Sequence, residues 1–514
     1  MQTVNQYNLA VVLFTAFGSF TYGFNSSIIA STTGLPSFWS YFNLATSGPR
    51  ADWSTQMIGA MNSLYSAGGL IGCLTVGWLA DKIGRKRSIQ IICAICVTAS
   101  VFTTASVNIG MFLAGRGIQG LGSGMIDTIC PLYQSEISPA HARGRMVGMH
   151  AVFLVSGYAG ASWVGLGCYF EDNPDIQWRL CIAFQTLAPL MLLLGSHVIP
   201  ESPRYLIYNR RDEEGLQVLM KLHSYSEDLD NRYAYAEFEQ IKQQVELDRA
   251  SERSWLALWK TPNTRKRMIF GFLVIAIAQS SGVLVINNYQ IVLYEGLGIT
   301  GWKALLLLSI YTSWAAFMNW INAILLDRIG RIKLMVIGMT GAAIAISCES
   351  AMVARFAGTD NAIGNGFGVL FLFLFITFFA GGMDASCYVY LSEIFPTWMR
   401  AQGVSFSVAG LFTTTLLYTG SASIAFSEIR WKYYLVFIFA SLVGAGVIWY
   451  FFPETNGLSL EEIGVLFGDE VATAAPELTA NGMKGVHTLT TGIEVSDGDM
   501  NGSRDVKDSK ELKV

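Results

Sequence analysis

Long apolar blocks separated by short charged islands constrain this sequence more than any other feature. Hydrophobic residues make up 52% of the 514 residues and charged residues only 14%, whereas about a quarter of the residues in a soluble domain are charged. Each block is about 20 residues long, and a helix of that length spans the hydrocarbon core of a bilayer. The pattern therefore predicts an all-α membrane protein.

Twelve such blocks occur along the chain. Glycine and proline within several of them are compatible with spanning helices, and the small residues at 120–124 are typical of a face on which helices pack closely. We expect membrane helices at about 9–30, 55–80, 89–108, 110–134, 147–170, 178–199, 268–290, 303–326, 334–356, 367–391, 401–425 and 431–452.

Lysine and arginine residues predict the orientation, because they favour the cytoplasmic side of a membrane. They gather in the loops after the second, fourth and eighth blocks and in the segment 200–267, whereas the long loop 31–54 carries only Arg50. Both termini are therefore predicted to be cytoplasmic in a multi-pass protein, and the plasma membrane is the default location.

The same pattern divides the chain into four segments. Six apolar blocks precede a charged stretch with amphipathic helical patches, six follow it, and the C-terminal residues are mostly small and polar, as in disordered chains. We expect an N-terminal six-helix bundle at 1–199, a cytoplasmic helical linker domain at 200–267, a C-terminal six-helix bundle at 268–454 and a cytoplasmic tail, mostly disordered, at 455–514.

The two halves repeat each other in sequence. Residues 127–139 and 384–396 are identical at seven of thirteen positions, with a constant offset of 257, and an arginine follows the shared glutamate by seven residues in both. A second repeat joins residues 81–85 to residues 327–331. The chain is therefore predicted to form two pseudo-symmetric six-helix bundles, the architecture of carriers that open alternately to the two faces of a membrane.

Seven motifs lie in order at the ends of the expected helices, at 77–86, 116–120, 131–136, 200–204, 327–331, 392–396 and 453–457. Together they resemble those of the sugar porter family of the major facilitator superfamily, over nearly the whole chain up to about residue 464. The details are most similar to fungal members.

The resemblance implies the major facilitator fold and transport of a sugar or sugar-like polyhydroxylated solute by alternating access, as a uniporter or a proton symporter. It implies no cofactor and no metal. The expected partners are the solute, protons and the lipid bilayer, without nucleic acid, and the monomer is the expected functional unit.

Two alternatives stay open: an exporter of a secondary metabolite or drug, and a nutrient sensor that does not transport. An enzyme is not expected, because no nucleophile, metal cluster or phosphate loop is visible outside the spanning helices.

The substrate site implied by the resemblance departs from the family pattern. The helix-5 glutamine of the family is Ala151 here, next to His150, and the helix-10 tryptophan is Tyr388. Helix 7 keeps one of two glutamines, Gln279, for which a hydrogen bond between helices is the alternative role. Amide groups suit a sugar because each offers donors and acceptors. The candidate substrate-binding residues are Gln279, Asn287, Asn288, Tyr289, Tyr388, Asn25 and His150.

Proton coupling is an open question at this point. In proton-driven relatives an aspartate of helix 1 pairs with the helix-4 arginine, here Arg116, but this chain has Asn25, which cannot titrate. Asp127 and Asp384 each lie nine residues before the repeated glutamate, about 13.5 Å along a helix and near the middle of the bilayer. Acids at that depth usually face a cavity or a partner. Both are candidate proton carriers, and a structural pair bonded to nearby hydroxyl groups is the alternative.

Charged residues of the motifs cluster where each half is expected to meet the cytoplasm. The resemblance implies that they form salt bridges and helix-end contacts that stabilise the outward-open state and break as the halves rock apart, a use that suits two states a few kcal/mol apart. The alternative is plain helix capping and topology charge. The candidate gating residues are Asp81, Arg85, Glu136, Arg143, Glu201 and Arg204 in the first half and Asp327, Arg331, Glu393, Arg400 and Glu454 in the second.

Overall fold

A computed structural model describes residues 5–45, 48–139, 142–223, 231–249, 257–359, 361–458 and 460–468. The described residues form helices, with no strand among them. The predicted tail begins with a short helix, α20 (Leu460–Leu466), and its remainder beyond residue 468 lies outside the described residues.

Twelve membrane segments run along the structure, as predicted. Eleven of those described are long and apolar enough to span a bilayer, and the twelfth, α5, is rich in glycine and polar residues. In chain order the helices are α1 (Gln6–Thr33), α3 (Ala51–Ile83), α4 (Arg85–Thr104), α5 (Ile109–Ile137), α6 (Arg143–Tyr169), α7 with α8 (Pro174–Ala183, Leu187–Gly195), α12 with α13 (Pro262–Gln279, Val283–Gly296), α14 (Trp302–Ile329), α15 (Arg331–Phe356), α16 with α17 (Ala362–Phe378, Ala385–Ile394), α18 (Arg400–Glu428) and α19 (Tyr434–Phe451).

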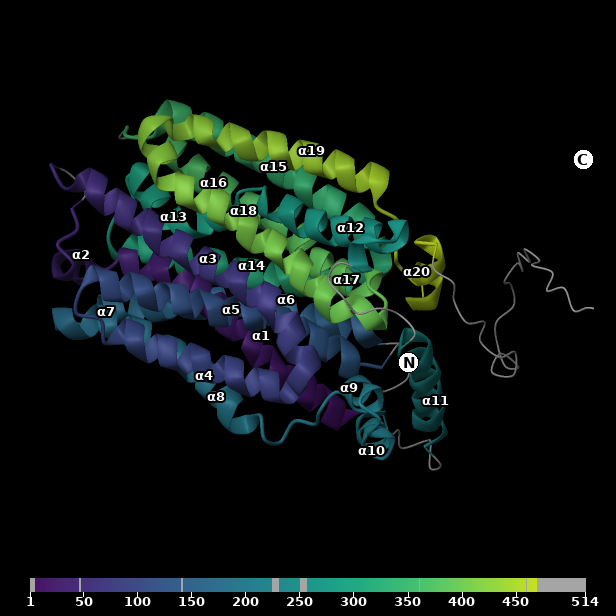
Figure 1. Cartoon of the computed structure of the whole chain (residues 1–514). Coiled ribbons are helices and arrows are strands. Elements are labelled where there is room, and N and C mark those ends of the chain that lie inside the picture. Colours follow the sequence, from purple (N-terminus) through teal and green to yellow (C-terminus); the bar gives the residue numbers. More distant parts are fainter. Residues whose placement is uncertain are drawn as a thin grey trace, which may run out of the picture. The chain divides into compact units, whose positions relative to one another are not determined.

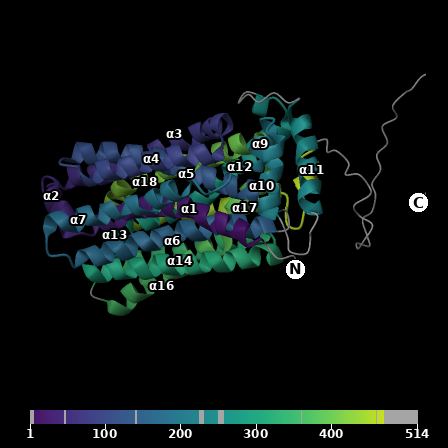
Figure 2. The same cartoon turned by 90° about the horizontal axis from the view of Figure 1, so that it is seen from below.

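The remaining helices cap the two ends of the bundle (Figures 1 and 2). The short helices α9 (Pro203–Tyr208), α10 (Asp212–His223) and α11 (Arg232–Arg249) lie at the end that carries the charged motifs, which we call the motif end. Helix α2 (Pro36–Tyr41) lies at the opposite end, beside α7.

Besides the sixth segment, where a 3-10 turn at Phe184–Thr186 joins α7 to α8, two of the predicted continuous helices are interrupted. The seventh segment breaks between α12 and α13, where Gly282 has a φ of 84°, a value that L side chains rarely adopt. The tenth contains a π-helical turn at Phe379–Asp384, between α16 and α17. Hydropathy alone did not predict either break, because both interrupted segments remain apolar throughout.

Small residues allow the helices of the first half to approach closely, as predicted for the run at 120–124. A Cβ on Gly120 would lie 2.0 Å from the carbonyl oxygen of Tyr65, and one on Gly124 would lie 2.1 Å from that of Gly69. Backbone therefore packs directly on backbone between α3 and α5, and a larger side chain at either glycine would separate these helices.

Two long helix pairs join the halves, α3 with α18 and α6 with α14. In Figure 1 the helices of the first half (purple to blue) lie below most of those of the second half (green to yellow). At the motif end, a Cβ on Gly77 of α3 would lie 2.7 Å from Ser405 Oγ of α18. At the opposite end, Trp163 Nε1 of α6 donates to Ser313 Oγ of α14 over 2.9 Å. The halves are thus in contact at both ends.

Candidate functional site

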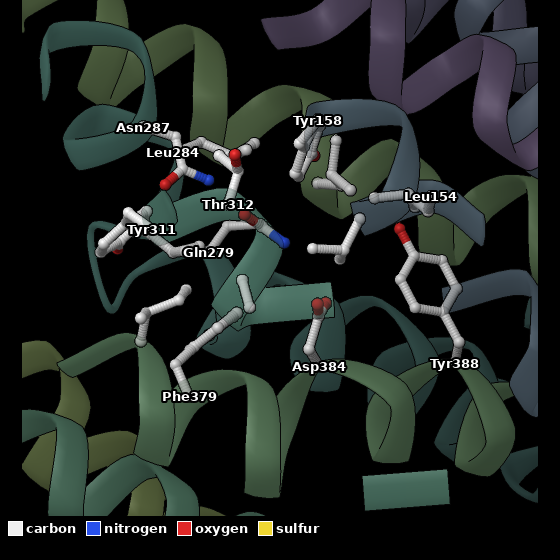
Figure 3. Close-up of a pocket in the computed structure, with 15 residues that line it drawn as sticks. Leu154, Tyr158, Gln279, Leu284, Asn287, Tyr311, Thr312, Phe379, Asp384 and Tyr388 are labelled. Carbon is white, nitrogen blue, oxygen red and sulfur yellow. The ribbon is translucent and has the colours of Figure 1, made fainter. Parts of the chain in front are cut away.

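A cavity lies between the two halves (Figure 3). Its fifteen lining residues come from α6 of the first half and from α12, α13, α14, α16, α17, α18 and the π-helical turn of the second. Four of the predicted site residues line it: Gln279, Asn287, Asp384 and Tyr388.

The π-helical turn aims Asp384 into this cavity. Asp384 is the last residue of the turn, and its carboxylate points toward the cavity centre in Figure 3. Two asparagines of α14 hold the turn: Asn319 Nδ2 donates to Asp384 Oδ2 over 2.8 Å, and Asn322 Nδ2 donates to the carbonyl oxygen of Ala380 over 3.0 Å. A π-turn places one residue out of the regular helical order, which is why such turns are common at functional sites.

Two amide side chains face the same cavity from the broken seventh segment. Gln279 is the last residue of α12 and Asn287 lies one turn into α13, so the break at Gly282 brings both amides to one side. Both side chains are more than nine-tenths buried. Neither the Oε1 atom of Gln279 nor the Oδ1 atom of Asn287 accepts a hydrogen bond from a described residue. These oxygens are therefore available to a bound solute.

A second polar group lies directly behind Tyr388. The Tyr388 hydroxyl donates to Asp127 Oδ2 over 3.4 Å, and the Tyr388 ring lies 4.7 Å from the ring of His150. His150 Nε2 is 3.3 Å from Asp127 Oδ1, within ion-pair distance but without the alignment of a hydrogen bond. His150 Nδ1 lies 2.8 Å from Ser19 Oγ. Helices α1, α5, α6 and α17 thus meet at one fully buried acid and imidazole.

Three predicted site residues lie away from the main cavity. Asn288 lines a neighbouring cavity, which shares Leu284 and Leu411 with the first. Tyr289 points toward α18, where its hydroxyl donates to the carbonyl oxygen of Thr419 over 3.1 Å. Asn25 is buried between α1 and α5, and its Nδ2 atom donates to Ser123 Oγ over 3.2 Å.

Arg116 of α5 does contact Asn25 of α1, but through the backbone of Asn25. Arg116 Nη1 donates to the carbonyl oxygen of Asn25 over 3.0 Å, and its guanidinium lies 4.3 Å from the ring centre of Tyr65. Cation–π attraction and one carbonyl thus take the place of a carboxylate at this buried arginine.

The prediction missed several cavity residues. Tyr158 of α6 and Tyr311 and Thr312 of α14 line the cavity, and Asn319 of α14 holds Asp384. Asn319 could have been found, because an amide within an apolar membrane helix seeks an internal partner. The tyrosines and the threonine carry no such signal, since aromatic residues and threonine are common in spanning helices.

The first group of motif charges forms a buried network at the motif end. Arg85 pairs with Glu136 through Nε and Nη2, at 3.0 and 2.9 Å, and with Asp81 at 3.2 Å. Glu201 Oε1 accepts from the backbone N–H groups of Arg85 and Lys86, at 2.8 and 3.2 Å. The network joins the end of α3, the start of α4 and the end of α5, and Glu201 satisfies free N–H groups at the α4 N-terminus.

The second group repeats this geometry. Arg331 pairs with Glu393 at 2.9 Å and with Asp327 at 3.1 Å, while Glu454 accepts from the backbone N–H groups of Arg331 and Ile332 at 2.9 and 3.0 Å. Each of these ion pairs joins helices within one half. The sequence repeat is therefore also a structural repeat.

Within the first network, burial raises the pKa of Glu201, while backbone N–H donors and the charge of Arg85 oppose that shift. The three motif arginines outside the two networks have separate surroundings. Arg204 lies partly buried on α9, and Arg400 Nε donates to the carbonyl oxygen of Phe395 over 3.2 Å. Arg143 begins α6, but its side chain lies outside the described part of the structure.

Comparison with known proteins places the chain in a family. Residues 11–467 match the family model described as "Sugar (and other) transporter". The chain belongs to this transporter family. It is 32% identical over 453 residues to the MFS-type transporter criB of Aspergillus cristatus, which covers 88% of this chain and 91% of that protein. It is 26% identical over 484 residues to the high-affinity glucose transporter of Kluyveromyces lactis, which covers 90% of this chain and 86% of that one.

A solved structure of the family fold is similar over the whole bundle. The proton:xylose symporter XylE, in complex with 6-bromo-6-deoxy-D-glucose, matches with a TM-score of 0.78 and 22% identity over 90% of this chain and 99% of that one. The predicted major facilitator fold is confirmed. As a member of the Sugar (and other) transporter family, the chain is a multi-pass membrane transporter rather than an enzyme.

Proposed function

We propose that this transporter carries a sugar or a similar small polyhydroxylated solute across the plasma membrane by alternating access. The observation that carries the proposal is the cavity between the halves, with Gln279, Asn287, Asp384 and Tyr388 directed into it. A solute with several hydroxyl groups can both donate to these oxygens and accept from these amides. The glucose transporter and the xylose symporter to which the chain is similar support the same substrate class.

Uptake into transporter-null cells tests this function. Labelled hexoses, disaccharides, polyols and quinate are offered at acid and neutral external pH, with and without a protonophore. Saturable uptake of at least one of them is expected, and Gln279→Ala should weaken it because a cavity amide is lost. Binding without uptake would favour a sensor. Net efflux of a different solute would favour the alternative function, that of an exporter.

We further propose that Asp384 and Asp127 carry the coupling proton if transport is uphill. Asn25 cannot titrate, whereas Asp384 faces the cavity and Asp127 lies behind Tyr388 with His150 beside it. The Arg116 contact with the Asn25 carbonyl then has a structural role. Asp384→Asn should abolish pH-driven accumulation while counterflow exchange continues, and intact uphill uptake in that variant would exclude Asp384 as the carrier.

The ion-pair networks of the motif end fit a gating role within each half. They fix the ends of α3, α4 and α5, and of α14, α15 and α17, so that each half can move as a rigid body. We place the motif end at the cytoplasm, together with both termini, and expect the monomer to be functional. Protease protection of an N-terminal epitope tag in intact cells tests the orientation.

A further inference from the structure

The central cavity carries more negative charge than the residues around it can balance. Of the described residues that line it, Asp384 alone is charged. Asp127 lies close behind, against Tyr388. One imidazole, that of His150, lies 3.3 Å from Asp127, and when protonated it can neutralise one of the two carboxylates. One negative charge then stays buried inside the membrane.

Such a charge is costly in that place. A buried carboxylate is tolerated when a cation or several donors pair with it, and here Asn319 supplies one donor, at 2.8 Å. An uncompensated charge in a membrane interior selects for a partner of opposite sign. Arg116 is engaged elsewhere, with the Asn25 carbonyl and the Tyr65 ring.

The other polar groups of the lining are neutral. The amides of Gln279 and Asn287 offer both donors and acceptors, and their oxygens accept no hydrogen bond from a described residue. The carboxylate of Asp384 adds a negative charge to this lining. Ammonium and hydroxyl groups bring donors to such a lining, whereas a carboxylate ligand brings only acceptors and a second negative charge.

From this charge balance we infer that the cavity selects a hydroxylated solute that bears a protonated amine, and that it rejects sugar acids. The ammonium group pairs with Asp384, and the ring hydroxyls reach Gln279 and Asn287. This inference rests on the proposed function and specifies its substrate class. In this mode the substrate supplies the positive charge that a proton supplies when the solute is neutral.

A matched series of three solutes tests the inference on the purified full-length protein in nanodiscs. D-glucose, D-glucosamine and D-glucuronate share a pyranose ring and differ in one substituent each: hydroxyl, ammonium or carboxylate. Equilibrium dialysis of labelled solute at neutral pH should show D-glucosamine binding about tenfold more tightly than D-glucose. D-glucuronate should bind more weakly than either.

Two variants separate the carboxylate of the cavity from charge in general. Asp384→Asn keeps the side-chain size and should abolish the preference for the amine, so that D-glucosamine no longer binds more tightly than D-glucose. Glu295→Gln removes the same charge from the exposed end of α13 and should leave the order of the three solutes unchanged. N-acetyl-D-glucosamine on the unmodified protein offers a check that needs no variant, because acetylation removes the positive charge.

The outcomes distinguish the inference from the function on which it rests. If D-glucose binds as tightly as D-glucosamine, or if Asp384→Asn keeps the preference, the inference is overturned and sugar transport stands. If the acetylated amine binds as tightly as the free amine, the inference is likewise overturned. If none of the solutes binds and none is taken up by proteoliposomes, the proposed function itself is overturned.

Discussion

At the scale of single residues, burial decides which charges matter. The Arg85 side chain is 9% exposed and that of its partner Glu136 is 4% exposed, whereas Arg211 and Glu214 form an ion pair in which both side chains are more than half exposed. Water screens the exposed pair and satisfies its groups when one partner is lost. Water cannot replace a lost partner in the buried pair in this way. Removal of Arg85 therefore leaves the Glu136 carboxylate without a cation.

Arg85→Ala should therefore destabilise the protein strongly. Removal of one partner of a buried pair costs about 3–5 kcal/mol, because the other charge remains buried. A fluorescence-monitored thermal unfolding scan in detergent should show a clear drop in the midpoint. Arg211→Ala is the matched control and should leave the midpoint nearly unchanged. Equal shifts in the two variants would contradict this account.

Glu349 is the opposite case, a buried acid without a hydrogen-bond partner among the described residues. Its side chain on α15 is fully buried, and neither carboxyl oxygen accepts a hydrogen bond from a described residue. A polar group buried without a partner costs about 1–3 kcal/mol. Glu349→Met keeps the length of the side chain and should raise the unfolding midpoint. A lower midpoint would mean that the carboxyl group forms a stabilising contact.

At the scale of elements, the two interrupted segments determine the cavity. The break after α12 turns Gln279 and Asn287 to one side, and the π-helical turn before α17 turns Asp384 toward them. Uninterrupted helices of the same sequence would distribute these side chains differently around their axes. Glycine permits the first break, since Gly282 has a φ of 84°.

Gly282→Ala should weaken binding and slow transport. The substitution strains a positive-φ position by about 1–3 kcal/mol, and its Cβ would lie 2.6 Å from the ring of Phe437. Gly296→Ala, at the end of α13 with no atom within 4 Å of the new Cβ, is the control. Initial rates of solute exchange in proteoliposomes should fall for Gly282→Ala alone. Similar rates in both variants would show that the break tolerates a side chain.

At the scale of the whole molecule, contacts between the two halves at both ends of the bundle define the conformational state of the carrier. Helix α1 packs on α13, α6 packs on α14 and on α17, and α3 packs on α18. A carrier must break such contacts on one side at a time, so each set is transient in the transport cycle. Interfaces of this kind can be trapped by a covalent link.

A disulfide between Gly148→Cys and Ala323→Cys should stop transport. A Cβ on Gly148 of α6 would lie 3.6 Å from the Cβ of Ala323 on α14, which suits the geometry of a disulfide. Oxidation should abolish solute exchange in proteoliposomes, and a reductant should restore it. The two single variants should remain active under oxidation. Continued exchange in fully cross-linked protein would show that these helices need not separate at the motif end.

The motif networks were largely predictable from sequence, and the cavity only in part. Asp81, Arg85 and Glu136 lie at helix ends. The repeat at residues 327–331 and 393 indicated that the corresponding charges of the second half form the same kind of group. In the cavity, Tyr289 was a candidate, but it turns to α18 and donates to Thr419. The sequence around Tyr289 does not indicate this direction, because the direction of its side chain depends on where the helix breaks.

The sequence by itself determined the twelve membrane helices, their duplication and the charged motif end, because hydropathy and repeats depend on composition and spacing along the chain. Only the tertiary structure decided which polar residues share a cavity. Asp127, His150 and Tyr388 come from α5, α6 and α17 and meet because those helices pack together. Asp384 reaches the cavity through a local change of helical order. Contacts between distant segments depend on packing, to which the order of residues along the chain is only an indirect guide.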